Sequence, residues 1–213
     1  MATDRAVLFV DGNNWYHGLR AIGVTNLLEL NYATISKKLA GPRMWAETRY
    51  YIGRVQQTPL GAQAYADQRR FLARLQRSDS RISIHLGRLE PRTVENPAAT
   101  ELQQYLHGLT TKIDRKVFHD LMDLSRRHRT GEVVVEKAVD VMIAVDMVRM
   151  AERGEYDAAY LLSADGDFTP AVEAVRACNK KVYAASPLQG AQLASAVNAF
   201  IPLERLWFAD CYK

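Results

Sequence analysis

The chemistry that this 213-residue sequence offers lies in carboxylates placed where apolar runs of the chain end. Asp11, Asp165 and Asp167 stand there, and a fourth acid, Asp140, falls in the first turn of a predicted helix. Gathered at one place they would repel each other, because two like charges about 4 Å apart cost roughly 4 kcal/mol at an effective dielectric of about 20. A cation must offset that repulsion, and carboxylates without zinc-type cysteine or histidine spacing favour Mg²⁺ or Mn²⁺. We therefore expect the four acids to be metal ligands and catalytic residues.

A divalent cation held by carboxylates suits phosphoryl transfer, since it orients a water molecule, lowers its pKa and neutralises charge on phosphate oxygens. Asn14 and Ser163 are neutral side chains beside the acids, and we expect them to bind substrate; Asn14 could equally be a helix N-cap. Lys137 precedes Asp140 by three residues and would assist the phosphate if both are helical. Asp146 is about 120° further around that helix, so it would stand behind the ligands or pair with a nearby arginine.

The elements that must position these residues follow from hydrophobic periodicity. Unbroken apolar runs at residues 6–10 and 158–162 predict strands buried on both faces of a parallel sheet. Further strands are expected at 45–55, 81–89, 133–135 and 180–186, with an edge strand or extended tail at 199–206. Helices are expected from residue 15 and at 32–39, 61–76, 101–128, 139–154, 170–177 and 190–197.

This alternation predicts an α/β fold with a doubly wound, mainly parallel sheet, which binds ligands at the carboxyl ends of its strands. Asp11, Asp165 and Asp167 stand at such ends. We expect Asp167 also to cap the next helix, with Pro170 in its first turn. Residues 91–97 are expected to form a loop.

The segment at 97–130 is the least expected part of the chain. Leucines and other apolar residues recur there at spacings of three and four, which predicts one long amphipathic helix or two shorter ones broken near Gly108. This segment would pack on the sheet, form a homodimer or cover the substrate as a basic lid. We expect a single domain over residues 1–213 with a helical insertion at about 97–130.

The composition gives expectations about the partner and the cellular compartment. A formal net charge of +4 mildly favours a polyanionic partner. Four arginines on the predicted helix at 61–76 and just after it are either solvated surface or RNA contacts: Arg69, Arg70, Arg74 and Arg77. Cys178 and Cys211 lack metal-site spacing and favour a reducing compartment. The chain has no apolar run long enough to span a bilayer, so we expect a cytoplasmic protein with no membrane association.

Other phosphate-handling motifs are missing. The sequence has neither GxGxxG nor GxxxxGK[ST], and no serine and histidine stand at a nucleophile elbow. An aspartyl-nucleophile phosphatase would carry a second aspartate two residues after Asp11, where this chain has Asn13.

Three blocks of the sequence resemble the NYN domain, in particular the LabA-like branch of the PIN-like nucleases: VLFVDGNNWYHGL, EKAVDVMIAVDM and LLSADGDFTPAV. The resemblance implies a PIN-like three-layer α/β/α sandwich and a ribonuclease, expected to be an endoribonuclease, that uses Mg²⁺ or Mn²⁺ on single-stranded or structured RNA. The family's functional positions fall on eight residues of this chain: Asp11, Asn14, Lys137, Asp140, Asp146, Ser163, Asp165 and Asp167. Two alternatives stay open, a non-catalytic RNA-binding or regulatory protein-interaction module and a nucleotide phosphohydrolase.

Overall fold

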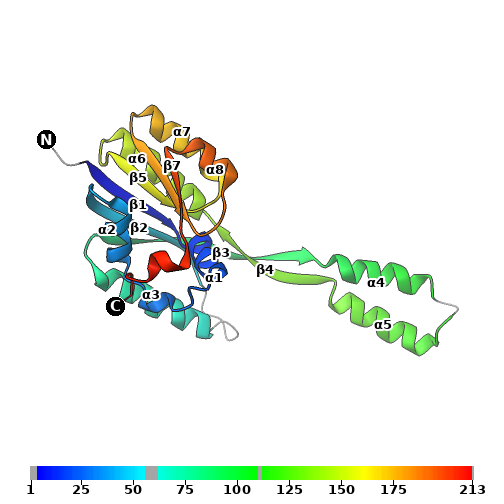
Figure 1. Ribbon diagram of the computed structural model, residues 1–213. Coiled ribbons are helices and arrows are strands. Elements are labelled where there is room, and N and C mark those ends of the chain that lie inside the picture. The colour runs from blue at the N-terminus through cyan, green and yellow to red at the C-terminus, as the bar shows by residue number, and fades with distance from the viewer. Residues whose placement is uncertain (1–3, 56–61, 110–111, 213) are drawn as a thin grey trace. The chain divides into compact units, whose positions relative to one another are not determined.

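The computed structural model describes residues 4–55, 62–109 and 112–212, without the side chains of residues 89–93 and 131–137. The chain divides into two compact units (Figure 1). Unit 1 comprises Met1–Arg88 and Lys137–Lys213, and unit 2 comprises Leu89–Glu136. Each unit is described by itself below.

Unit 1 is built on parallel strands in the order β3-β2-β1-β5-β6-β7. Strand β4 is the neighbour of β3 in the strand order, and all of it except Lys137 belongs to unit 2, as does the end of β3 after Arg88. Their bounds are β1 Arg5–Asp11, β2 Met44–Arg54, β3 Ile82–Glu95, β4 Thr130–Lys137, β5 Ala158–Leu162, β6 Lys181–Ser186 and β7 Ala199–Pro202. The order runs outward from β1 in both directions, so the switch point of the sheet lies between β1 and β5. Ligands of doubly wound sheets bind at such a point.

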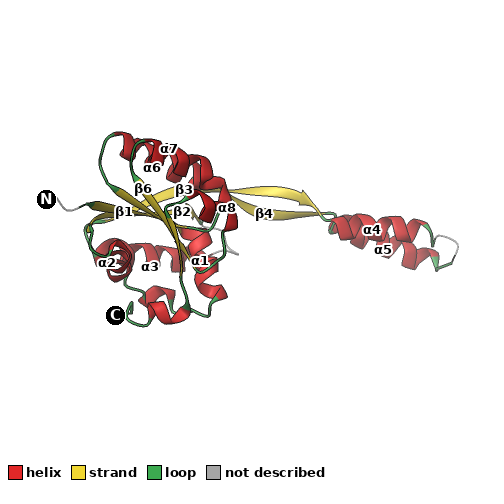
Figure 2. Cartoon of the chain, turned by 45° about the horizontal axis from the view of Figure 1, so that its top comes forward, coloured by secondary structure: helices red, strands yellow, loops and turns green. Residues whose placement is uncertain are grey.

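Helices cover both faces of this sheet. On one face lie α1 (Gly12–Ala21), α2 (Tyr32–Ala40) and α3 (Ala62–Ser78); on the other lie α6 (Val139–Glu152), α7 (Thr169–Ala177) and α8 (Ala191–Ala196) (Figures 1 and 2). Two hydrophobic clusters fill the two interfaces, and successive residues of β1 alternate between them. This three-layer α/β/α sandwich confirms the predicted fold class.

Three short 3₁₀ helices complete the elements: η1 Leu27–Glu29, η2 Gly166–Phe168 and η3 Arg205–Phe208. Among the described helices, none has the length and apolar character that crossing a membrane would require.

Several predicted boundaries were wrong, and those of α1 and β3 have a clear physical reason. Helix α1 begins at Gly12 rather than at Trp15, because the Asp11 side chain already accepts a hydrogen bond from the Asn14 backbone N–H. Strand β3 continues to Glu95, so the expected loop at 91–97 is not present. Pro91 lies beyond Arg88, the last β3 residue paired with β2, so it removes no hydrogen bond between these two strands.

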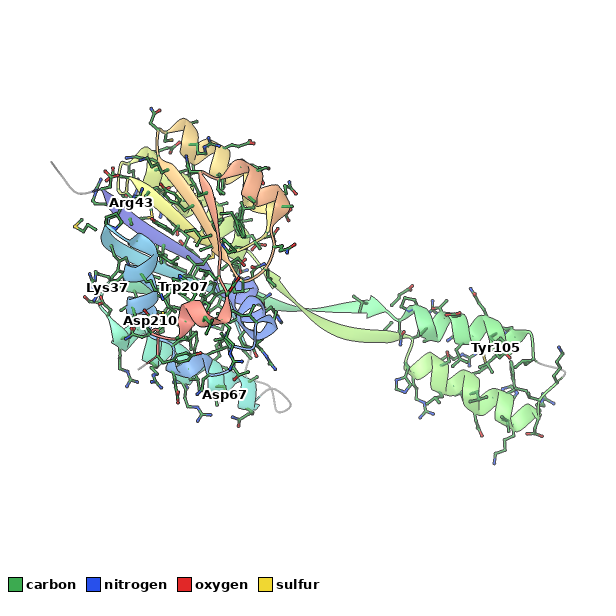
Figure 3. All side chains as sticks on the ribbon, viewed as in Figure 1. Lys37, Arg43, Asp67, Tyr105, Trp207 and Asp210 are labelled. Carbon is green, nitrogen blue, oxygen red and sulfur yellow. The ribbon has the colours of Figure 1, made fainter. Side chains whose placement is uncertain are left out.

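Unit 2 contains two helices, α4 (Pro97–His107) and α5 (Arg115–Arg127), which pack against each other. Leu106 and Met122 are buried there, and Ser125 Oγ donates to the carbonyl of Ala99 at 2.7 Å. Gly108 ends α4, so the segment forms two shorter helices rather than a single long one. Tyr105 stays 65% exposed on α4 (Figure 3).

Candidate active site

Asp11 lies at the switch point of the sheet. It is the last residue of β1 and is only 4% exposed. Its Oδ1 accepts from the backbone N–H of Asn14 at 3.1 Å, and its Oδ2 accepts from Ser163 Oγ at 3.1 Å. Because β1 and β5 are parallel neighbours, their carboxyl ends bring Asp11 and Ser163 together as predicted.

A chain of hydrogen bonds continues from Asp11 into the loop after β5. Ser163 Oγ accepts from the backbone N–H of Asp165 at 3.1 Å. Asn14 Oδ1 accepts from the backbone N–H of Ala164, also at 3.1 Å. Asn14 is therefore not an N-cap: its side chain holds the start of α1 against the loop that carries Asp165.

Asp165, and not Asp167, is the capping residue of this loop. Asp165 Oδ1 accepts from the backbone N–H of Asp167 at 2.9 Å and so caps η2. The N-cap of α7 is Phe168, without a side-chain hydrogen bond. The predicted cap at Asp167 was wrong because a 3₁₀ turn intervenes before α7, which moves the unpaired backbone donors toward Asp165.

Asp140 lies in the first turn of α6, near the other acids. Burial is the first cause that raises the pKa of its carboxyl above the usual value, and the charges of Asp165 and Asp167 raise it further. The charges of Asp165 and Asp167 thus disfavour the ionised form of Asp140. Ala138, just before α6, has φ 72° and offers no capping side chain.

Asp146 has the opposite environment. Its Oδ2 accepts from Arg49 Nη2 at 2.9 Å and from the Tyr51 hydroxyl at 2.8 Å. Its Oδ1 accepts from Arg149 Nη2 at 2.9 Å. The pairing with Arg149 was weighed from sequence, whereas Arg49 and Tyr51 were missed. Their signal is the two-residue spacing that puts both side chains on one face of β2.

Lys137 is the last residue of β4, so the condition that it share a helical face with Asp140 is not met. Its side chain lies outside the described residues.

The donor set suits a hard divalent cation in chemistry, since it consists of carboxylate oxygens whose mutual repulsion a cation would relieve. Within the described residues, however, no group of three or more His, Cys, Asp or Glu side chains is arranged to hold a metal ion.

One further neighbour of the acidic loop was missed. A Cβ on Gly166 would lie 2.5 Å from Gln192 Oε1, so the Gln192 side chain packs directly on the glycine between Asp165 and Asp167. A Cβ on Gly190 would lie 2.5 Å from the Ala164 carbonyl oxygen. The sequence signal for this close approach of α8 is a glycine at each contact, Gly166 in the loop and Gly190 before α8, because glycine has no Cβ.

Two aromatic residues that follow Asp11, Trp15 and Tyr16, differ in their exposure. Trp15 is buried in the core and packs edge-to-face on Phe208, with ring centroids 5.9 Å apart. Tyr16 is 40% exposed, and its hydroxyl accepts from Arg20 Nη1. Of the two, Tyr16 alone is accessible enough to stack on an unpaired base.

Comparisons with known proteins identify a matching family and a solved structure with a similar fold. The NYN domain family matches residues 5–204 of this chain. A crystal structure of a protein of unknown function from Vibrio parahaemolyticus RIMD 2210633 has a TM-score of 0.53 and 16% identity, covering 95% of this chain and 94% of that one. At this identity the likeness shows the fold alone. No curated protein matches the chain. The LabA-like branch stays a prediction.

Proposed function

The chain belongs to the NYN domain family, and we propose that it is a metal-dependent endoribonuclease that hydrolyses RNA phosphodiester bonds. NYN domains belong to the PIN-like nuclease superfamily. One observation carries the proposal: at the carboxyl edge of the sheet, burial raises the pKa of the Asp140 carboxyl, and Asp165 and Asp167 lie close enough for their charges to raise it further. Arrangements of this kind cost stability and are typical of functional sites.

Asp11, Asp140, Asp165 and Asp167 would hold Mg²⁺ or Mn²⁺ in this proposal. The bound ion would activate a water molecule and neutralise charge on the scissile phosphate. Asp11 is the most firmly positioned of the four, since both of its carboxylate oxygens accept hydrogen bonds. The acids on the β5 loop and on α6 would adjust around it.

Asn14 and Ser163 would have a double role. Asn14 Oδ1 faces the Ala164 N–H, which directs the Nδ2 group the other way as a donor for a phosphate oxygen. Ser163 is fully buried and donates to Asp11, so it orients that carboxylate more directly than it contacts RNA. Lys137 remains a proposed phosphate-binding residue on the strength of the family resemblance.

The proposal is tested by incubating labelled RNA, DNA and a nucleotide panel with the protein in Mg²⁺, Mn²⁺ or EDTA. Asp165→Asn keeps an oxygen that can cap η2 but removes the charge, so we expect metal-dependent RNA cleavage to fall by about 100-fold or more. The matched control is Asp123→Asn on α5, an exposed acid of unit 2, which should cleave like the unaltered protein.

The outcomes separate the candidate functions. Unaltered RNA cleavage by Asp165→Asn would contradict the assignment of the site. RNA that is bound but never cut at any metal concentration would favour the non-catalytic RNA-binding module. Hydrolysis of nucleotides alone would favour the phosphohydrolase.

A further inference from the structure

Helix α3 carries a concentration of positive charge. Four arginines lie on it: Arg69, Arg70, Arg74 and Arg77. The only acid within Ala62–Ser78 is Asp67, so this one helix accounts for most of the formal net charge of +4 of the whole chain. Exposed charge of one sign along a single helix attracts polyanions.

The arginines face outward because the opposite side of α3 is fixed on the domain. Leu75 belongs to the hydrophobic core, and Phe71 and Leu72 pack against it. Gln68 anchors the helix further: its Oε1 accepts from the Val55 N–H at 2.9 Å, and its Nε2 donates to the Gly53 carbonyl at 2.8 Å. The exposed side of α3 is thus held in one orientation.

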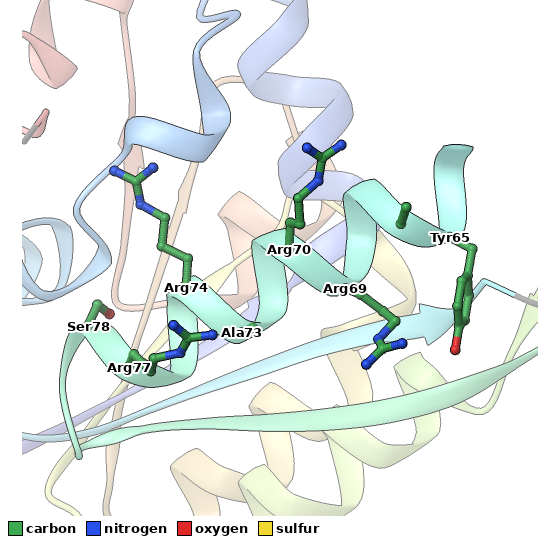
Figure 4. Close-up of a pocket in the computed structure, with 8 residues that line it drawn as sticks. Tyr65, Arg69, Arg70, Ala73, Arg74, Arg77 and Ser78 are labelled. Carbon is green, nitrogen blue, oxygen red and sulfur yellow. The ribbon is translucent and has the colours of Figure 1, made fainter. Parts of the chain in front are cut away.

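The surface between the arginines is hollowed. This hollow of about 680 Å³ is open to solvent and is lined by residues of α3 alone, with Arg70 and Arg74 on one side of the helix and Arg69 and Arg77 on the other (Figure 4). Tyr65 stands at one end, and its ring centroid is 5.7 Å from the Arg69 guanidinium carbon. Arginines flanking a hollow with an aromatic ring at its end combine phosphate binding with base stacking.

Among the described residues, most of the α3 arginines are not paired with a carboxylate. Arg70 pairs with Asp67. Across the ranges that the structure describes, Arg69, Arg74 and Arg77 have no carboxylate within ion-pair distance. Three guanidinium groups are therefore available to an external anion.

The hollow begins at the edge of the sheet that carries the acids. Asp11, at the carboxyl end of β1, is in register with Tyr51 of β2. Gly53, two residues further along β2, accepts the hydrogen bond from Gln68. The Tyr65 and Arg69 end of α3 therefore lies at the carboxyl edge, and the arginines continue from there along the domain.

We propose that this arginine face, comprising Tyr65, Arg69, Arg70, Arg74 and Arg77, binds the sugar–phosphate backbone of RNA on the flank of the cleaved bond. The identity of the polymer rests on the proposed function. Arginine–phosphate contacts release counterions, so each contact contributes about 0.7 to the slope of log affinity against log salt for a single strand. Three contacts would contribute roughly 2 to that slope.

The first test is binding of fluorescently labelled polyuridylate to the full-length protein in EDTA, measured by anisotropy over a salt series. Arg69→Gln/Arg74→Gln/Arg77→Gln should weaken binding by about 10-fold or more at low salt and reduce the slope by roughly 2. The control removes three exposed cations elsewhere: Arg127→Gln/Arg153→Gln/Lys181→Gln. We expect the control to lose less than about 3-fold, because only the general charge changes.

Equal losses in the two variants would overturn the proposal, since net charge alone would then explain binding. Unchanged binding by the α3 variant would overturn it as well. Melting temperatures of both variants should match that of the unaltered protein, because all six side chains lie on exposed residues. If the α3 variant has a lowered melting temperature, the salt series is repeated with Arg74→Gln alone. This single variant should still reduce the slope by roughly 0.7.

The second test separates this surface from the hydrolytic site. With long RNA, the α3 variant should show a raised KM and an unaltered kcat, because the proposed surface holds the flank of the strand rather than the reacting phosphate. RNA binding that depends on α3 without any cleavage would refute the nuclease and leave the surface standing. Cleavage of long RNA with the KM unchanged in the variant would refute the surface and leave the nuclease standing.

Discussion

Asp140 and Asp146 are six residues apart in α6 and experience opposite fields. Around Asp140 the neighbouring charges are those of Asp165 and Asp167, which disfavour its ionised form. Around Asp146 they are guanidinium groups, to which its carboxylate is hydrogen-bonded. The helix therefore presents one acid that a cation would stabilise and one that arginine already stabilises.

Neutralising these two acids should have opposite effects on stability in EDTA. Asp140→Asn removes repulsion that solvent partly screens, so we expect the melting temperature to rise by about 1–2 °C. Asp146→Asn weakens charge-assisted hydrogen bonds to Arg49 and Arg149, so we expect the free energy of unfolding to fall by about 2 kcal/mol. Thermal unfolding of Asp140→Asn and urea unfolding of Asp146→Asn, each beside the unaltered protein, provide the measurements. A lower melting temperature for Asp140→Asn would show that the carboxylate has a structural partner.

Asp79, just after the end of α3, makes a pH-dependent contribution to the stability of the fold. Hydrogen bonds from Arg81 lower the pKa of the Asp79 carboxyl from 3.8 to about 2. The folded value lies below the unfolded one, so the pair stabilises the fold above pH 3.8 and loses this contribution as the pH falls toward 2. Carboxyl NMR titration should show a midpoint near 2 that returns toward 3.8 in Arg81→Gln. An unchanged midpoint in that variant would assign the shift to another neighbour.

For the site, the sequence predicted which residues stand at the ends of strands, but it did not predict most of the contacts between their side chains. Asp11 and Ser163 meet because two predicted parallel strands end side by side. The cap assignment failed because whether a 3₁₀ turn or an α-helix begins after Asp165 depends on local geometry rather than on residue type. The arginine contacts of Asp146 depend on the distance between β2 and α6, which periodicity does not encode.

Among the elements, buried ones were the most predictable. The bounds of β5 match the apolar run at 158–162, because a strand covered on both faces needs no polar residue along its length. Strand β3 was the least predictable, since Pro91 normally indicates a loop. The helices of unit 2 were predicted as alternatives, and Gly108 ends the first of them. Packing of these helices on the sheet, and their action as a lid, stay predictions.

The contact of α8 with the acidic loop allows a matched pair of glycine substitutions. Gly190→Ala would press a methyl group against the Ala164 backbone carbonyl, which cannot move alone, so we expect a loss of about 2 kcal/mol in unfolding free energy. Gly166→Ala meets the flexible end of the Gln192 side chain, so the expected loss is below about 1 kcal/mol.

Chemical denaturation of the two variants gives the comparison. The order of the losses is the informative result, because the two added methyl groups face equally short distances and differ in what they touch. A greater loss for Gly166→Ala would mean that Gln192 is held rigidly in place.

At the scale of the molecule, both hydrophobic clusters consist entirely of unit 1 residues. We therefore expect a chain in which a short glycine–serine linker replaces residues 89–136 to unfold cooperatively, with a melting temperature within about 5 °C of the full-length value. Circular dichroism during heating measures this. Broad, non-cooperative melting of the shortened chain would show that unit 2 takes part in folding unit 1.

The homodimer, one of three alternatives for residues 97–130, and the cytoplasmic location stay predictions. Four large apolar side chains remain exposed on α4 and α5: Leu102, Tyr105, Val117 and Leu124. Gel filtration of Tyr105→Ser/Val117→Ser beside the unaltered chain tests the dimer without disturbing the buried Leu106.

Unit 2 also interrupts the chain between the acids, since Asp11 precedes it and the other three carboxylates follow it. A break between α4 and α5 would leave two polypeptides, each with an incomplete set of carboxylates. If each fragment is fused to one of two proteins that bind each other, the fragments would regain the full set of carboxylates only when those proteins meet. The proposed hydrolysis would then report that encounter. The placement of unit 2 thus makes this chain a natural scaffold for a split-protein sensor.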